Sequence, residues 1–209
     1  NADTETDNLA IGYDALGGAI DGGAYNIAIG NYSLDANTSG NFNTAVGYNA
    51  LTDNTTGQKN TAIGSNALYL NTTGSYNAAS GYYSMLNNTT GSSNTASGYE
   101  ALRANTTGGS NTAIGQGALK SNTTGTRNLA IGMGAYGAAD TEDDNLAIGY
   151  YALSGGINGG EYNVAIGNYS LDAATSGDNN TATGYDALTG NTTGADNTAL
   201  GYDAGDVIT

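Results

Sequence analysis

The sequence contains no proline, cysteine, histidine or tryptophan, and only one phenylalanine, in 209 residues. The absence of cysteine excludes a disulfide-stapled miniprotein and any thiolate zinc site. Nucleophilic triads and most general-base designs need histidine or cysteine, which are both missing here. The composition therefore predicts a protein that is not an enzyme.

Positive charge is almost absent. The four cations are Lys59, Arg103, Lys120 and Arg127, and with 19 acidic residues the net charge is -15. Nucleic acids need clustered lysine and arginine, and anionic membrane surfaces attract the same residues. No apolar run approaches the roughly 18 residues of a membrane-spanning helix. We therefore expect no nucleic-acid partner and no membrane insertion in this segment.

Bulky apolar side chains are also scarce, since 34 residues are glycine and only 38% are apolar. Such a chain cannot fill a thick globular core at interior packing density. Low hydrophobicity with high net charge favours disorder, unless a regular repeat provides a thin, continuous core.

A regular repeat runs through the whole chain. The pentapeptide Asn-x-Ala-x-Gly recurs in steps of 17 residues, with two steps of 18, and begins at Asn8, Asn26, Asn43, Asn60, Asn77, Asn94, Asn111, Asn128, Asn145, Asn163, Asn180 and Asn197. We call each unit a coil and its opening asparagine position 1. Position 3 is alanine and position 5 is glycine in every coil, position 8 is alanine or serine, and position 9 is usually leucine. Residues 1–209 therefore form one repeat array.

A longer period is superimposed on the coils. Residues 3–72 read closely like residues 140–209, an offset of 137 residues or eight coils. We interpret the chain as a segment of a longer fibre, which continues covalently or stacks end to end.

The repeat length selects the fold class. Seventeen residues are too few for a pair of packed helices. Glycine at position 5 and the recurrent Asn-Thr-Thr-Gly also disfavour helix formation. The pattern predicts an all-β, parallel β-solenoid (β-roll) of twelve coils of 17–18 residues. We expect extended segments at positions 1–5 and 6–10, a turn at Asn-Thr-Thr-Gly, and coils spaced about 4.8 Å apart.

Alternation along a strand assigns the faces of each coil. Positions 3 and 5 share one side, and we predict that they line a narrow interior, as at Ala10, Gly12, Ala62, Gly64, Ala113 and Gly115. Positions 2 and 4 carry isoleucine, leucine, valine or threonine on the outside. This apolar strip is of the kind that neighbouring parallel chains bury, and it weakens at Ser80 and Ser97.

The repeated polar and aromatic positions predict columns along the rod. The twelve opening asparagines form either a hydrogen-bonded ladder, which we favour, or ordinary turns. Tyrosine at position 6 predicts an aromatic column of Tyr13, Tyr48, Tyr82, Tyr99, Tyr150, Tyr185 and Tyr202. The Asn-Thr-Thr triplets also fit the N-glycosylation pattern, although a turn is the simpler interpretation.

The motifs NTAIG at residues 60–64 and 111–115, NLAIG at residues 8–12 and 145–149, and NVAIG at residues 163–167 resemble the head repeat of trimeric autotransporter adhesins (YadA-like). The longer NTAIGSNALYLNTTG at residues 60–74 resembles the arrays of bacterial and phage tail-fibre-like repeat proteins. The resemblance implies a left-handed β-roll, a side-by-side homotrimer and a location outside the cell, on the cell surface or on a virion. The adhesin-head coil is shorter, near fourteen residues, and the present coil adds its length around Asn-Thr-Thr-Gly.

Two acidic clusters are candidates for metal binding. Their carboxylates alternate along the chain, as at Asp3, Glu5 and Asp7 and at Asp140, Glu142 and Asp144, so that each set can face one way as hard oxygen ligands for Ca²⁺. Neither has the glycine and distal glutamate of an EF-hand loop. We favour a solvated acidic turn and expect no other cofactor.

The sequence thus predicts a structural shaft or stalk of an extracellular fibre, either a phage tail fibre or a bacterial surface appendage. One alternative is an adhesin that binds a host glycan or matrix protein as its surface receptor, with variable residues around Tyr82, Tyr83 and Arg103 as candidates. A weaker alternative is ice binding through threonine at position 2, which is present in six coils as Thr44, Thr61, Thr95, Thr112, Thr181 and Thr198.

Overall fold

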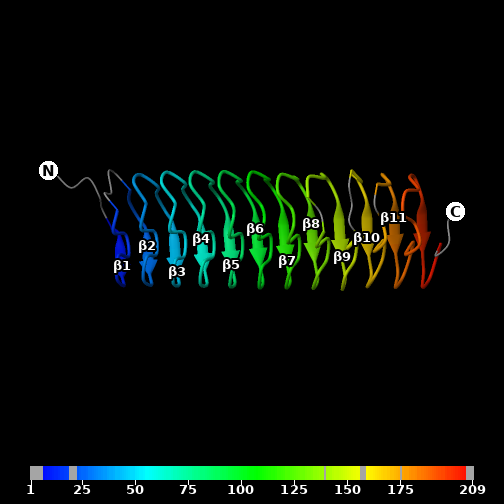
Figure 1. The fold of residues 1–209 in the computed structure, drawn as a ribbon, viewed down its shortest axis with the longest axis horizontal. Helices are drawn as coiled ribbons and strands as arrows, with labels where there is room; N and C mark the ends of the chain where they lie inside the picture. The colour runs from blue at the N-terminus through cyan, green and yellow to red at the C-terminus, as the bar shows by residue number, and fades with distance from the viewer. Residues whose placement is uncertain (1–6, 19–22, 139, 156–158, 175, 206–209) are drawn as a thin grey trace.

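The chain forms a straight rod in which each repeat makes one turn (Figure 1). The computed structural model describes residues 7–18, 23–138, 140–155, 159–174 and 176–205. Twelve strands follow one another in a single sheet, every neighbouring pair is parallel, and the described residues contain no helix. The predicted all-β, parallel β-solenoid is therefore confirmed.

Each coil contributes one strand of three residues at positions 2–4. The strands are β1 Leu9–Ile11, β2 Ile27–Ile29, β3 Thr44–Val46, β4 Thr61–Ile63, β5 Ala78–Ser80, β6 Thr95–Ser97, β7 Thr112–Ile114, β8 Leu129–Ile131, β9 Leu146–Ile148, β10 Val164–Ile166, β11 Thr181–Thr183 and β12 Thr198–Leu200.

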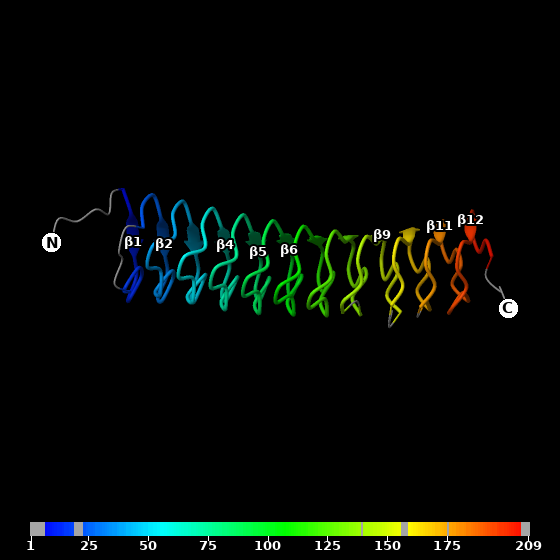
Figure 2. The same cartoon turned by 90° about the horizontal axis from the view of Figure 1, so that it is seen from above.

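The strands pair in register, so that equivalent residues of successive coils lie side by side. Ala62 pairs with Ala79, for example, and Ala10 pairs with Ala28 across the first coil of 18 residues. Eleven strand spacings give the rod a length of about 53 Å from β1 to β12. The strands lie along one side of the rod and the return segments along the other (Figure 2).

The predicted second extended segment at positions 6–10 is wrong, because the described residues contain only one strand in each coil. Positions 7 and 9 adopt left-handed backbone angles, as at Asn66 (φ 57°) and Leu68 (φ 52°). The residue before each opening asparagine does the same, as at Tyr76 (φ 61°). These residues bend the chain sharply where a strand would run straight.

The interior is a thin column of small and medium side chains. Alanine at position 3 and leucine at position 9 are fully buried through most of the rod, as at Ala62, Ala113, Leu68 and Leu119. Alanine or serine at position 8 completes this core. The left-handed angle at position 9 directs the leucine inward, which alternation along a strand does not predict. Ala10, in the first strand, is exposed.

Glycine at position 5 has a different role from the one predicted. Gly12 is exposed, and Gly64 and Gly115 are half-buried, so none of them lines the interior. Their φ angles of 137°, 129° and 126° are strained for any residue with a side chain. A Cβ on Gly64 would also lie 2.7 Å from the carbonyl oxygen of Gly81 in the next coil. Backbone conformation and close contact between coils therefore select glycine.

We predict that Ala113→Leu destabilises the rod, because position 3 is fully buried and a larger side chain forces neighbouring coils apart. The expected loss in free energy of unfolding is about 1–3 kcal/mol, measured by denaturant titration. The matched control is Thr112→Leu, one residue away on the outer face, where Leu129 and Leu146 occupy the same position in later coils. An equal loss in the two variants would contradict the assigned interior.

Candidate functional site

The opening asparagines form a hydrogen-bonded ladder along the entire described rod. The backbone N–H of each opening asparagine after Asn8 donates to Oδ1 of the opening asparagine in the preceding coil, at 2.7–3.1 Å. The series begins with the bond from Asn26 to Asn8 and ends with the bond from Asn197 to Asn180. The Nδ2 group donates to a carbonyl of its own coil, as Asn60 does to Gly74 at 2.8 Å. Most of these asparagines are almost completely buried. The ladder therefore ties every coil to the next inside the rod.

A second asparagine ladder lies at position 12, the first residue of Asn-Thr-Thr-Gly. It links the side chains of Asn37, Asn54, Asn71, Asn88, Asn105 and Asn122, with Nδ2 donating to Oδ1 one coil earlier at 2.7–3.0 Å. These side chains are fully buried. A glycan on Nδ2 would remove these bonds and would not fit, so the structure opposes glycosylation of the folded ladder.

The second ladder ends where the sequence changes. Oδ1 of Asn122 has no hydrogen-bond partner among the described residues, and the next coil has Tyr136 where most coils have leucine. Tyr136 is fully buried, and its hydroxyl accepts a bond of 2.7 Å from Nδ2 of Asn145. Burial, reinforced by the nearby Glu142 carboxylate, raises the pKa of Tyr136 well above its ordinary value. This coil therefore replaces amide pairing with a neutral phenol.

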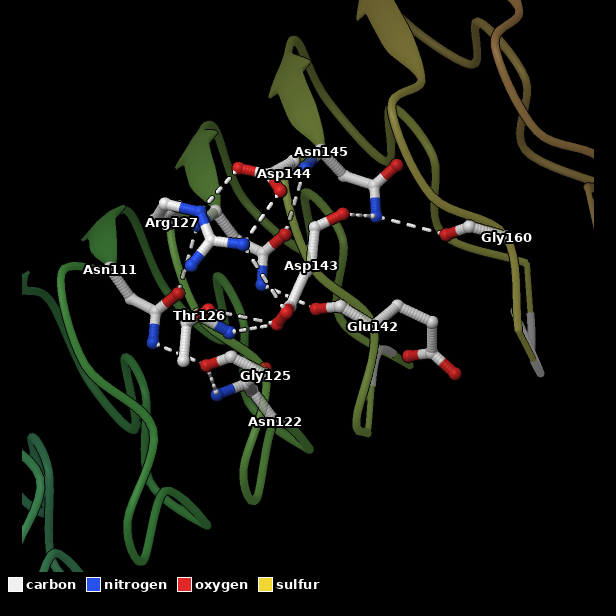
Figure 3. Close-up of polar contacts among 11 residues, drawn as sticks. Asn111, Asn122, Gly125, Thr126, Arg127, Glu142, Asp143, Asp144, Asn145 and Gly160 are labelled. Atoms are coloured by element: carbon white, nitrogen blue, oxygen red, sulfur yellow. Dashed lines mark hydrogen bonds and ion pairs between the residues drawn. The ribbon is translucent and has the colours of Figure 1, made fainter.

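The acidic residues of this same coil do not converge. Glu142 is 3% exposed, and its carboxylate accepts backbone N–H groups of Asp140, Thr141 and Gly159. Figure 3 shows the Glu142 side chain extending away from the side of the coil where Asp144 meets Arg127. The side chain of Asp140 instead accepts a bond from a threonine of the preceding coil.

Asp144 forms the strongest ion pair of the cluster. Arg127 Nε and Nη2 donate to its two carboxylate oxygens at 2.6 and 2.7 Å. These hydrogen bonds hold the pKa of Asp144 below its ordinary value. Across the described ranges, no three His, Cys, Asp or Glu side chains lie close enough to hold a metal ion. In the other predicted cluster, Asp7 is exposed, and Asp3 and Glu5 lie outside the described residues.

Aromatic rings line the outside of the turn that follows most of the strands. Successive tyrosines at position 6 stack in parallel, with ring centroids 5.8 Å apart for Tyr82 and Tyr99 and 5.4 Å for Tyr185 and Tyr202. Where position 7 carries the tyrosine, most contacts are edge-to-face, as between Tyr13 and Tyr32 at 5.5 Å, whereas Tyr83 is tilted against Tyr82. The column therefore combines positions 6 and 7, and it is discontinuous.

The outer faces of the strands form the apolar strip, defined as positions 2 and 4 of β1–β12. Ile11, Ile63 and Ile114 are 56%, 47% and 41% exposed. Ser80 and Ser97 interrupt the strip in two adjacent coils. The described residues offer no helix with the length and hydropathy to cross a membrane.

A shallow groove of about 350 Å³ breaks the regular surface, and the sequence analysis did not find it. Position 7 carries a side chain in every coil except two adjacent ones, which have Gly117 and Gly134. The groove lies over these glycines, between Glu100 of the preceding coil and Tyr151 of the following one. Two successive glycines in an otherwise occupied column were the signal that could have located it.

Charged residues gather at one end of the groove. Lys120 Nζ lies 2.6 Å and Arg103 Nη1 lies 3.4 Å from opposite oxygens of Glu100. The guanidinium of Arg103 also lies over the Tyr83 ring, 5.8 Å from its centroid. The variable residues around Tyr83 and Arg103, which are the sequence-based candidates for adhesion, therefore adjoin the groove.

These features define the chain as a parallel β-solenoid with two internal asparagine ladders, an exposed apolar strip and a surface groove over Gly117 and Gly134. No family model, curated protein or solved structure matches the chain.

We predict that Asn111→Ala destabilises the centre of the rod by about 1–3 kcal/mol, because the buried N–H of Asn128 loses its only acceptor. Amide hydrogen exchange should show faster exchange of Asn128 and its neighbours. Thr107→Ala, at an exposed turn position, is the control and should change the stability by less than about 0.5 kcal/mol. Unchanged protection of Asn128 would show that the ladder contributes nothing.

We also predict that millimolar Ca²⁺ does not raise the melting temperature, because Asp140, Glu142 and Asp144 have separate partners. The measurement is a thermal melt with Ca²⁺ and with chelator, and Mg²⁺ controls for ionic strength. A rise specific to Ca²⁺ that Asp144→Asn abolishes would show that the acidic cluster rearranges around the ion.

Proposed function

We propose that this chain is a non-catalytic structural shaft, a segment of an extracellular fibre whose length is set by the number of coils. The observation that carries the proposal is the asparagine ladder, which runs through all twelve coils without a break. Each opening asparagine is paired with the opening asparagines of the neighbouring coils. Adding coils therefore lengthens the rod without a new design for its interior.

We propose further that identical chains pack side by side through the apolar strip, as a homotrimer. Isoleucine and leucine side chains that are 37–80% exposed lie along one face of β1–β12. An exposed apolar face of this length, even with the interruption at Ser80 and Ser97, marks an interaction surface. The number three follows from the resemblance to trimeric adhesin heads, which also supports a place on a cell surface or a virion.

Adhesion is a second candidate, because the repeat is broken at the groove and at the neighbouring cluster of Tyr82, Tyr83, Glu100 and Arg103. A passive shaft does not require such a break. Ice binding has weaker support, since the threonine column at position 2 is interrupted by Ala78 and by three successive apolar residues from Leu129 to Val164.

The side-by-side assembly predicts a solution mass of about three times the 20.8 kDa of one chain. The triple variant Ile63→Ser, Ile114→Ser and Ile131→Ser should shift the mass toward one chain, because it removes three large apolar groups from the strip. Light scattering after size-exclusion chromatography measures the mass of the original protein and of the triple variant.

Serine at position 4 is already present at Ser80 and Ser97, so the variant should keep the fold, as circular dichroism can verify. The control is Tyr76→Asn, which removes an exposed ring away from the strip at a position that Asn179 also occupies with positive φ. A single-chain mass for the original protein, or a triple variant of unchanged mass, would disprove association through this face.

A further inference from the structure

We infer that the groove between Glu100 and Tyr151 binds a neutral saccharide, with one pyranose ring lying against Tyr151. This inference does not depend on the shaft function, because the groove contains no residue of the apolar strip. It gives the adhesion candidate a specific place and a class of ligand.

The floor of the groove is open at Gly117, where the side chain at position 7 is missing. A Cβ built on Gly117 would meet no atom within 4 Å, so this position opens into free space. The φ angle of Gly117 is 66°, close to the 54° and 57° of Asn49 and Asn66 at the same position. The backbone therefore tolerates a side chain here, and glycine is needed only to keep the groove open.

An aromatic ring forms one wall. A Cβ on Gly134 would lie 2.6 Å from Cε1 of Tyr151, which shows that the ring covers the space of the missing side chain. Tyr150 supports this ring edge-to-face, with centroids 4.6 Å apart. Tyr151 remains 37% exposed, and Met133 beside the floor is 39% exposed. This end of the groove therefore presents a flat apolar surface to solvent.

Hydrogen-bonding groups form the rest of the lining. Gln116 and Ser154 both donate and accept, and Lys120 and Glu100 neutralise each other at the far end. Three strand spacings, about 14 Å, separate the coil positions of Glu100 and Tyr151. The groove therefore has room for one or two sugar rings, and its volume lies in the range of small-molecule sites.

This combination selects the class of ligand. A wholly apolar ligand would remove water from the Glu100–Lys120 ion pair and from Gln116 without offering hydrogen bonds in return, at a cost in free energy for each desolvated group. A strongly anionic ligand would have to replace the Glu100 carboxylate as the partner of Lys120 and Arg103, against the field of a chain with net charge -15. A pyranose has a C–H face for the Tyr151 ring and hydroxyl groups at its perimeter for the polar lining.

Saturation-transfer NMR on the full chain tests the inference with the methyl glycosides of glucose, galactose, mannose and N-acetylglucosamine. Methyl glucuronide serves as the acidic counterpart. We expect saturation of at least one neutral glycoside. Gly117→Asn, which fills the groove, and Tyr151→Asn, which removes the wall, should each weaken this binding by at least about tenfold.

Both substitutions introduce asparagine at position 7, which Asn49 and Asn66 already occupy, so the melting temperature should change little. Tyr32→Asn removes a tyrosine at the same position in a coil outside the groove, and should leave binding intact. The inference is overturned by absence of binding, by binding of the glucuronide alone, or by equal binding in the original chain and both groove variants.

Discussion

The buried amide pairing between coils is the interaction on which the rest of the structure depends. An asparagine side chain carries a donor and an acceptor, and burial without partners costs free energy for each. A single coil can satisfy Nδ2 of Asn60 through its own Gly74, but Oδ1 needs the N–H of Asn77 in the next coil. The coil is therefore stable only as a member of a stack, and the same bond fixes the register of β4 and β5.

The conformation of each coil makes this dependence stronger. In most coils, three residues with side chains adopt φ between 49° and 64°, at positions 7 and 9 and directly before the opening asparagine. Such angles cost about 1 kcal/mol or more for each residue. They also turn leucine at position 9 inward, as at Leu68 and Leu119, where it fills the space between the alanines. Strain within the coil is thus offset by burial and pairing that form only between coils.

The repeat, the parallel solenoid and the outward-facing strip could be predicted from the sequence, because they follow from a fixed period and from alternation along a strand. Alternation failed beyond Gly64, because left-handed residues at Asn66 and Leu68 reset the direction of the side chains. The buried ladder at position 12 was missed, because Asn-Thr-Thr-Gly is also a typical turn. The groove was missed because it depends on the open space at Gly117 and on the placement of the Tyr151 ring over Gly134, which only the structure shows.

The interior, the apolar strip and the groove are built from separate sets of positions in this coil. The ladders and the core use positions 1, 3, 8, 9 and 12, whereas the strip uses positions 2 and 4. Positions 6, 7 and 10 point outward and contribute little to the core, so substitutions there cost little stability. This freedom explains how Gly117 and Gly134 can open a groove while Asn111 and Asn128 keep the ladder intact beneath it. The surface of the rod can therefore vary locally while the ladder of opening asparagines continues beneath it.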